Sequence, residues 1–288
     1  MSTLEYESLD EGEALSLSEA SAITSAVRCR IVVAGGPAKS GKTTLFAELF
    51  QRFLAGPVGE FEFAGSRTLR GWERRLHLSR TASQGMQPDT DRTEYESPDE
   101  YLHLRLADMA SNGDQTDLLL LDWAGERFRE IRDRPSLATD ALELGSVDHI
   151  SVIVDGAALA QSGGRHAARA DADRLMQALL DSGAARDCRS SVVYTKWDHV
   201  ANVGEATLES FLRTFEGTFR SKHEARLQSL SFLKTCARSE FPTALEAGMG
   251  LPELLREWMI PRKRPVLVRE MDRPAALRPF DRFRIGAR

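Results

Sequence analysis

The eight residues Gly36 to Thr43 read GPAKSGKT and match the pattern G-x-x-x-x-G-K-[ST] at its four fixed positions. Glycines at the first and sixth positions let the backbone bend so that its N–H groups point at phosphate oxygens. We expect Lys42 to reach the β- and γ-phosphates of a nucleotide, and the Thr43 hydroxyl to ligate Mg²⁺. The alternative is a chance glycine-rich turn, which the strand and helix patterns around these residues disfavour. The full predicted phosphate cradle is Gly36, Lys39, Ser40, Gly41, Lys42, Thr43 and Thr44.

A second candidate site begins with the carboxylate of Asp122, in the segment Asp122-Trp123-Ala124-Gly125. A carboxylate at the end of a buried strand can hold Mg²⁺ directly or through water. The Gly125 N–H could then face the γ-phosphate, so the loop that follows would sense hydrolysis. An Asp in an ordinary tight turn is the structural alternative, and the position of Asp122 downstream of the cradle favours the functional one.

A third segment, Thr195-Lys196-Trp197-Asp198, has the chemistry to distinguish guanine from adenine. The Asp198 carboxylate can accept hydrogen bonds from the N1–H and the N2 amino group of guanine, and adenine lacks that pair of donors. A site built around such bonds strongly rejects an analogue without them. The Lys196 stem can cover the base, and Thr195 can brace the phosphate cradle. Taken alone this short motif could be a charged surface turn; the three segments in this order predict binding of GTP.

Each segment follows an apolar run that is typical of a strand buried on both faces, at residues 27–34, 117–121 and 190–194. Further strands are predicted at 101–106, 149–155 and 230–233, and helices at 43–54, 66–77, 167–180, 207–220 and 251–259. This alternation predicts an α/β protein with the three-layer P-loop NTPase fold, a mostly parallel six-stranded sheet with helices on both faces. Ligands of such sheets bind beyond the carboxyl ends of the strands, where the three segments lie.

Together the segments resemble the Ras-like P-loop GTPases of the translation-factor-related class, over residues 27–260. Thr195 stands where the guanine motif of that class usually has Asn, and Thr is a known variant. Residues 235–238, TCAR, resemble its fifth motif, Ser-Ala-Lys, although the cysteine and the arginine depart from the usual residues. The resemblance implies that the Ala237 N–H contacts the guanine carbonyl and that Arg238 belongs to the site. It also implies that strands 101–106 and 117–121 pair antiparallel.

The paired Thr43-Thr44 and residues 122–127, DWAGER, resemble two subgroups of this class in particular. One is the Arf and heterotrimeric-α-like GTPases, and the other is the bacterial double-GTPase family of predicted conflict and defence systems. Residues 63–69, FAGSRTL, together with the DWAGE segment favour the second. That resemblance implies GTP or GDP with Mg²⁺ as ligands, and a protein effector or a second GTPase as partner.

Glu126 follows the sensor glycine, where such GTPases usually have the Gln that orients the attacking water. A carboxylate can accept a hydrogen bond from water but cannot donate one to the transition state, and its charge opposes the negative phosphoryl group. Glu126 and Lys42 are the candidate catalytic residues at this position and in the cradle. We expect slow GTP turnover unless a partner completes the site. An arginine supplied by the chain or by a partner would offset the negative charge that develops on the phosphoryl group. Arg127 and Arg129 lie nearby, and a solvated switch surface is the favoured interpretation of both.

The resemblance also implies a first switch before strand 101–106, in which a Thr closes on Mg²⁺ and the γ-phosphate. Thr93 is preferred as this catalytic and metal-binding residue because it lies nearer the strand, and Thr90 is the alternative. Residues 65–100 contain six arginines, and a loop this long in a compact domain is usually functional or disordered. The region is either a solvated basic helix or a surface for an effector or an acidic partner.

The 288 residues are 42% hydrophobic, enough for one core of ordinary size, and the net charge of −5 argues against a general nucleic-acid binder. The three cysteines have no metal-ligand spacing and are expected to be small buried residues in a reducing compartment. The chain starts without an apolar signal run, and no stretch is long enough to span a membrane. We expect a cytoplasmic protein.

Three units are predicted along the chain: an acidic flexible arm at 1–24, a GTPase domain at 25–260 and a basic tail at 261–288. Residues 1–22 contain six acidic residues and no Lys or Arg, and could form a short helix at 15–20. The tail has nine basic residues against three acidic ones. A loose solvated tail, and a tail docked on a partner or on its own core, both stay open.

Three functions are open from the sequence. A Mg²⁺-dependent GTPase switch is favoured, in which GTP orders the arginine-rich region and the Asp122 loop and hydrolysis releases them. A nucleotide-binding scaffold with little turnover is the alternative that Glu126 keeps open. A non-guanine P-loop ATPase or nucleoside kinase is the third, and Asp198 argues against it.

Overall fold

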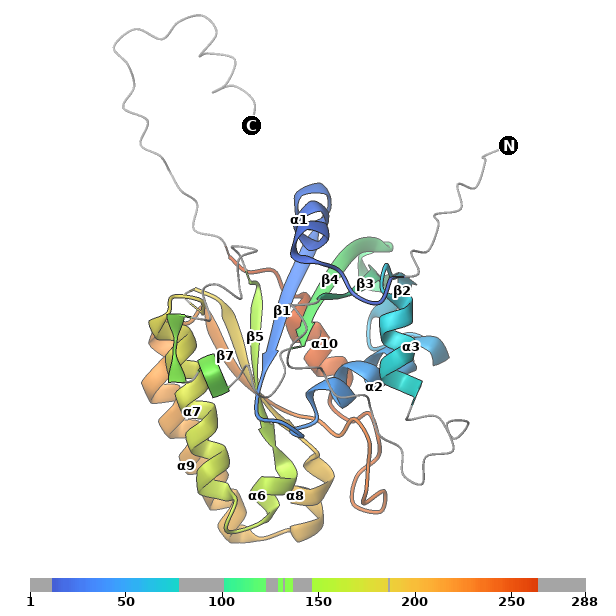
Figure 1. Ribbon diagram of the computed structural model, residues 1–288. Helices are drawn as coiled ribbons and strands as arrows, with labels where there is room; N and C mark the ends of the chain where they lie inside the picture. Colours follow the sequence, from blue (N-terminus) through green and yellow to red (C-terminus); the bar gives the residue numbers. More distant parts are fainter. Residues whose placement is uncertain are drawn as a thin grey trace, which may run out of the picture.

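The structure is a computed structural model that describes residues 12–77, 101–122, 129–131, 133–136, 147–185 and 187–263. Seven strands form one sheet in the order β2-β3-β4-β1-β5-β6-β7 (Figure 1). They are β1 (Cys29–Gly35), β2 (Phe61–Gly65), β3 (Tyr101–Asp108), β4 (Asp114–Asp122), β5 (His149–Asp155), β6 (Arg189–Thr195) and β7 (Ser229–Lys234). The strands from β4 to β7 in this order are parallel, and β3 pairs antiparallel with both β2 and β4.

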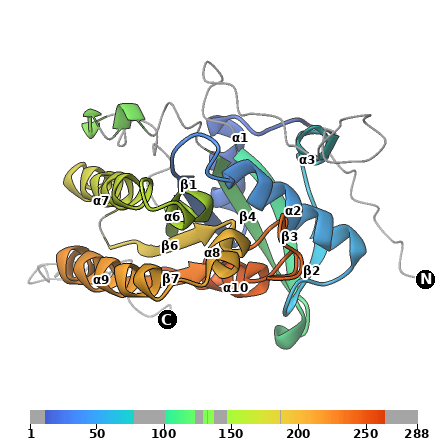
Figure 2. The same cartoon turned by 90° about the horizontal axis from the view of Figure 1, so that it is seen from below.

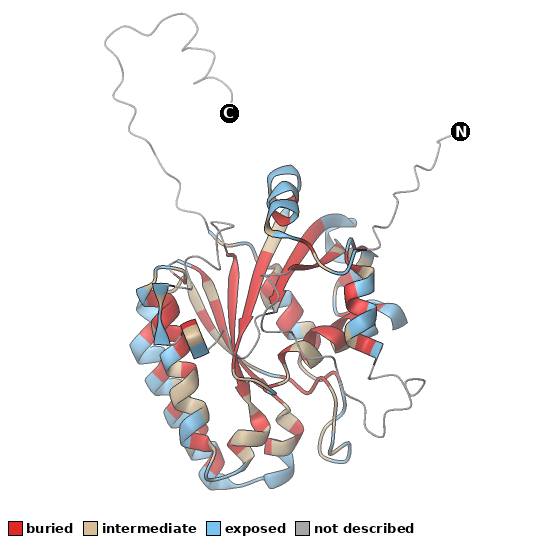
Figure 3. Cartoon of the chain, in the orientation of Figure 1, coloured by how far each residue is buried: buried red, intermediate tan, exposed pale blue. Residues whose placement is uncertain are grey.

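Helices cover both faces of the sheet. They are α1 (Leu17–Ala26), α2 (Lys42–Ala55), α3 (Leu69–His77), α6 (Gly156–Ala160), α7 (Arg165–Asp181), α8 (Trp197–Val203), α9 (Ala206–His223) and α10 (Leu251–Met259). Because strand side chains alternate between the faces, Val33 and Ile150 share a buried cluster with α1, α7 and α9. Val32 and Ile153 share the other cluster with α2, α3 and α10. Figure 3 shows the buried sheet between helices whose outer surfaces are exposed.

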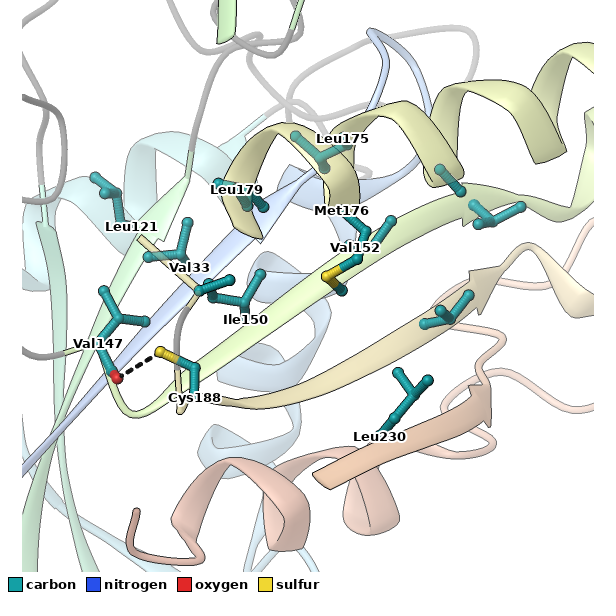
Figure 4. Close-up of a cluster of buried hydrophobic side chains, with 14 of the residues drawn as sticks. Val33, Leu121, Val147, Ile150, Val152, Leu175, Met176, Leu179, Cys188 and Leu230 are labelled. Atoms are coloured by element: carbon teal, nitrogen blue, oxygen red, sulfur yellow. Dashed lines mark hydrogen bonds between the residues drawn. The ribbon is translucent and has the colours of Figure 1, made fainter. Parts of the chain in front are cut away.

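The cluster beneath α7 shows how a helix is fixed to the sheet (Figure 4). Leu175, Met176 and Leu179 form one face of α7, and all three are fully buried. Beside them, the Cys188 thiol donates a hydrogen bond to the Val147 carbonyl at 3.2 Å. Burial raises the pKa of Cys188 to about 11, so this thiol stays protonated at neutral pH.

The predicted α/β fold class is confirmed, with one correction to the number of strands. The sequence predicted six strands, and β2 is the seventh. It is five residues long and lies at one edge of the sheet, where β3 is its neighbour and the register shifts between Phe63 and Gly65. A strand this short, bounded by glycine and interrupted by a bulge, gives too few alternating positions for a periodicity to be read.

The predicted helices at 43–54, 66–77, 167–180, 207–220 and 251–259 correspond to α2, α3, α7, α9 and α10. The antiparallel pairing of strands 101–106 and 117–121 is also confirmed. The turn between them contains Asn112 and Gly113 in the left-handed region, at φ values of 55° and 81°. The short helices α6 and α8 were not predicted, because five and seven residues are too few for a helical period.

Part of the predicted flexible arm belongs to the folded structure. Residues 17–24 lie in α1, which begins with a capping box between Ser16 and Glu19 and buries Ile23. The preceding Leu15 is also buried and exchanges two backbone hydrogen bonds with Tyr101, the first residue of β3. The capped helix therefore agrees with the short helix considered at 15–20, although it begins two residues later and extends to Ala26. Residues 1–11 and 264–288 lie outside the described residues.

A chain of buried polar groups joins α10 to the sheet. The Trp258 indole donates to the Ser151 hydroxyl at 2.9 Å, Ser151 and Ser191 lie 3.0 Å apart, and Ser191 lies 2.9 Å from His149 Nε2. The indole can only donate, so the Ser151 oxygen accepts its N–H. Ser151 can then donate its hydroxyl hydrogen to Ser191, and Ser191 can donate to His149 Nε2. Burial lowers the pKa of His149 to about 3, with a smaller contribution from Arg189, so its ring is neutral.

This histidine should make the fold sensitive to mild acid. Between pH 6.5 and about 3 the unfolded chain binds a proton at His149 and the folded chain does not, so stability falls as pH falls. From pH 7 to pH 5 the loss from this site is about 2 kcal/mol. Urea unfolding at both pH values should show this slope in the unaltered protein and a smaller one in His149→Asn. The exposed His166→Asn should keep the original slope; an equal slope in all three proteins would exclude His149 as the cause.

Candidate nucleotide site

The phosphate cradle follows β1 directly and begins the site at the carboxyl end of the parallel strands. Lys39 and Gly41 have positive φ values of 62° and 86°, so the backbone reverses tightly here. A Cβ on Gly36 would lie 2.8 Å from the Ile153 carbonyl oxygen, which leaves room at this position for glycine alone. The Ser40 hydroxyl is buried and has no hydrogen-bond partner among the described residues. These features are those of a loop shaped around a ligand.

Lys42 is the first residue of α2 and lies against this loop. Its side chain is only 5% exposed, and Nζ donates to the carbonyls of Gly36 and Pro37 at 2.9 and 3.0 Å. The ammonium group is thus held on the inner side of the cradle, at the positive end of the α2 dipole. Thr43 and Thr44 follow in the first turn of α2 and are half-buried.

The second segment is only partly described. Asp122 ends β4 and pairs in register with Ala34 of β1, so its backbone lies beside the start of the cradle. Its side chain lies outside the described residues. So do Gly125, Glu126 and Arg127, and likewise the two switch candidates Thr90 and Thr93. Arg129 is described and exposed.

The third segment contacts the cradle directly. The Thr195 hydroxyl donates to the Ser40 carbonyl at 2.6 Å and lies 3.2 Å from the Val154 carbonyl. Lys196 adopts a left-handed conformation, with φ of 47°, and its Nζ donates to the Lys39 carbonyl at 2.7 Å. Two predicted site segments that are far apart in sequence are therefore held together. Figure 2 looks onto this end of the molecule, where α2, α6 and α8 surround the ends of the strands.

Asp198 lies in the first turn of α8 and is 1% exposed. One carboxylate oxygen, Oδ2, accepts the backbone N–H groups of Glu240 and Phe241 at 2.8 and 3.2 Å. The other, Oδ1, is buried and has no hydrogen-bond partner among the described residues. A buried acceptor without a donor is costly, so this oxygen fits a ligand that brings an N–H group. Burial and the nearby Asp198 raise the pKa of Cys236 to about 11, so the neighbouring thiol is neutral.

Ala237 and Arg238 follow β7 and complete the predicted set. Thr235, just before them, accepts the Trp197 N–H at its carbonyl at 3.1 Å, which joins the third segment to this one. The Arg238 Nε lies 3.6 Å from Glu48 Oε2, so a residue of α2 holds the arginine. The structure thus brings the cradle, the Thr195 segment and the TCAR segment together at one end of the sheet.

Residues 30–259 match the sequence model of the family described as Double-GTPase 2. The chain belongs to the Double-GTPase 2 family. This confirms the predicted resemblance and decides between the two subgroups that the sequence left open. It also shows that the chain is a GTP-binding protein of the GTPase class.

Two solved structures were compared with this double-GTPase. A chain of the signal recognition particle receptor SRb-GTP/SRX complex from Chaetomium thermophilum is 14% identical, with a TM-score of 0.42 over 80% of this chain and 97% of that one. The bacterial selenocysteine-specific elongation factor EF-Sec is 16% identical, with a TM-score of 0.40 over 80% of this chain and 28% of that one. A search of curated proteins found no significant match.

Two site residues of this double-GTPase were missed by the sequence reasoning. Asp155, the last residue of β5, caps α6 by accepting the Ala157 N–H at 3.0 Å and also accepts from Lys196 Nζ at 3.2 Å. It thereby orients Lys196 of the third segment. An Asp that ends a buried strand was the available signal, the same signal that identified Asp122. Glu48, which holds Arg238, had no comparable signal because it lies within a helix.

None of the described helices has the length and apolar character needed to cross a membrane.

Proposed function

We propose that this double-GTPase is a Mg²⁺-dependent molecular switch that hydrolyses GTP to GDP and phosphate. The observation that carries the proposal is the buried Oδ1 of Asp198, which has no hydrogen-bond partner in the described part of the chain and lies in a segment that is hydrogen-bonded to the phosphate cradle through Thr195 and Lys196. One ligand that offers an N–H donor and a chain of phosphates would satisfy both features. A guanine nucleotide has both.

Each part of the site takes one role in this proposal. The cradle binds the phosphates, Lys42 neutralises charge on the β- and γ-phosphates, and Asp198 accepts the guanine N1–H. Lys196 covers the base, the Ala237 N–H donates to the guanine carbonyl, and Arg238 borders the base. Mg²⁺ would be held by the Thr43 hydroxyl, Asp122 and the switch residue Thr93, and it would supply charge neutralisation at the transferred phosphoryl group.

The proposal is tested by titrating the purified chain with GTP, GDP and ATP in the presence of Mg²⁺, followed by GTP turnover in the same preparation. We expect GTP and GDP to bind much more tightly than ATP, with slow release of phosphate. Omitting Mg²⁺ should weaken GTP binding more than GDP binding, because the γ-phosphate adds a ligand to the metal. Equal affinity for GTP and ATP would contradict the guanine assignment.

A nucleotide-binding scaffold with little turnover is the second candidate, and Glu126 is the observation that favours it. Glu126→Gln should raise the GTP turnover number about tenfold, because the amide restores a donor toward the transition state and removes a like charge. Phosphate release under saturating GTP measures this change. Glu253→Gln on the exposed surface of α10 makes the same charge change away from the site and should leave the rate unaltered. A slower Glu126→Gln enzyme would show that the carboxylate serves as a base in hydrolysis, which would contradict the scaffold alternative.

A protein effector or a second GTPase completes the proposal. The exposed Arg67 precedes α3 and the exposed Arg70 lies in its first turn, both within the arginine-rich region 65–100 in which the first switch is predicted. They support an acidic partner that reads the nucleotide state. We also propose a cytoplasmic location, which the free thiols of Cys29, Cys188 and Cys236 support because such thiols persist in reducing compartments.

A further inference from the structure

The segment from Cys236 to Met249, called the base loop below, joins β7 to α10 and is closed on itself. The Cys236 N–H donates to the Met249 carbonyl at 2.9 Å, and the Gly248 N–H donates back to the Cys236 carbonyl at 2.5 Å. Within the loop the Ser239 hydroxyl donates to the Leu245 carbonyl at 2.6 Å. The base loop is therefore a compact unit with adjacent ends, the arrangement of a surface loop that keeps its own shape.

Contacts with two helices hold the base loop in place. The Phe241 ring packs edge-on against the His199 ring of α8, with centroids 5.0 Å apart and an interplanar angle of 89°. The Glu240 carboxylate lies 3.3 Å from His199 Nε2. On the other side, Arg52 of α2 donates to the Ala247 carbonyl. His199 is the residue after Asp198, so this contact fixes the loop beside the carboxylate that is proposed to read the base.

The base loop in turn fixes the Asp198 carboxylate. The N–H groups of Glu240 and Phe241 both donate to Oδ2. Rotation of the carboxylate about its Cβ–Cγ bond would break both hydrogen bonds inside a buried site, where unpaired groups are costly. Oδ2 therefore stays hydrogen-bonded to the base loop, and Oδ1 remains the oxygen that can accept a hydrogen bond from a nucleotide base. A binding group is precise when neighbouring contacts lock its rotamer in this way.

We propose that the base loop determines guanine specificity by holding Asp198 in the orientation that accepts the guanine N1–H. Phe241 and His199 are positioning residues, because they act on the base through the loop and the carboxylate. The inference rests on the proposed role of Asp198 in guanine recognition. It adds Glu240, Phe241 and His199 to the site, and these three residues lie outside the motifs that the sequence analysis identified.

The test is the ratio of GDP to ADP affinity, measured by calorimetric titration of the full chain. Phe241→Ala should lower this ratio about tenfold by weakening GDP binding, while ADP binding through the phosphate cradle stays unchanged. Phe241→Tyr keeps the ring and should keep the ratio. The matched control is Phe211→Ala, which removes another edge-on contact between a Phe and a His ring, with His166 at 5.5 Å and 89°. Phe211 lies on α9, and its loss should leave the ratio unchanged.

The outcomes separate this inference from the proposed function. An unaltered chain that binds ADP as tightly as GDP would overturn both. A guanine preference that Phe241→Ala retains in full would overturn the inference alone, and so would an equal loss of GDP and ADP affinity, which indicates a general structural defect. If Phe241→Ala does not fold, as judged by circular dichroism, His199→Ala decides: the inference requires the same selective loss, and an unchanged ratio in that variant would overturn it.

Discussion

Asp198→Asn will abolish the guanine preference and lower the ratio of GTP to ATP affinity roughly a thousandfold. The amides of Glu240 and Phe241 need an acceptor, so the single oxygen of the asparagine side chain must take the place of Oδ2. Its amide nitrogen then faces the base. There its N–H donors face the N1–H of guanine, which is also a donor, so guanine loses a hydrogen bond. Adenine N1 is an acceptor and gains one. Both changes lower the ratio of GTP to ATP affinity.

Competition between GTP and ATP for a fluorescent nucleotide measures this ratio directly. Asp198→Ala separates the two contributions, because alanine removes the acceptor without placing a donor against adenine. It should lose the guanine preference without gaining ATP affinity. Asp181→Asn, at an exposed carboxylate at the end of α7, is the control for the change of charge. An Asp198→Asn protein that still prefers GTP would place guanine recognition elsewhere.

The segments of the candidate nucleotide site could be predicted because each is a fixed pattern of residue types at the end of a buried strand. Parallel strands bring their carboxyl ends to one edge, so the proximity of the cradle to Thr195 followed from the fold class. The structure confirms that the two segments are close, because the Thr195 hydroxyl donates a hydrogen bond to the Ser40 carbonyl. The residue types and the place of each segment at the end of a predicted strand were sufficient here, since both can be read from the sequence.

The contacts that hold Asp198 could not be predicted, because they come from backbone N–H groups. Every residue except proline has such a group, so the types of Glu240 and Phe241 carry no signal for it. The base loop also lacks a periodic pattern from which its shape could be inferred. A similar limit applies to His149, which lies at the start of an apolar strand and shows its buried polar partners only when β5, β6 and α10 are assembled.

The contacts between segments also couple the two halves of the site. Lys196 donates to the Lys39 carbonyl of the cradle and to Asp155, and Asp198 follows two residues later. A displacement of the cradle would therefore be transmitted through Lys196 to Asp198, the proposed base-binding residue, and a displacement of Asp198 would reach the cradle by the same contacts. Variants on the two sides should consequently be compared by which nucleotides they affect, and not by the size of the effect alone.

Lys42→Ala will lower the affinity for GTP, GDP, ATP and ADP together, by about 100-fold or more for GTP. The ammonium group is the cation that the structure holds against the cradle carbonyls of Gly36 and Pro37, where phosphate charge would be bound. Alanine leaves the backbone N–H groups and the α2 dipole, which are weaker without a full charge beside them. Lys42→Met keeps the length of the stem and should bind as poorly, which would assign the effect to charge. Lys222→Ala, at an exposed ion pair on α9, should bind normally.

The diagnostic feature of Lys42→Ala is that the ratio of GTP to ATP affinity should survive while both affinities fall, because the phosphates are common to the two nucleotides. Asp198→Asn should show the reverse, with a changed ratio and a retained contribution from the phosphates. The two variants therefore test separate halves of one site, and a double variant should lose both properties. Unchanged GTP affinity in Lys42→Ala would show that residues 36–43 do not bind the phosphates. Loss of the ratio in that variant would show that the contacts of Lys196 with the cradle control base recognition as strongly as Asp198 does.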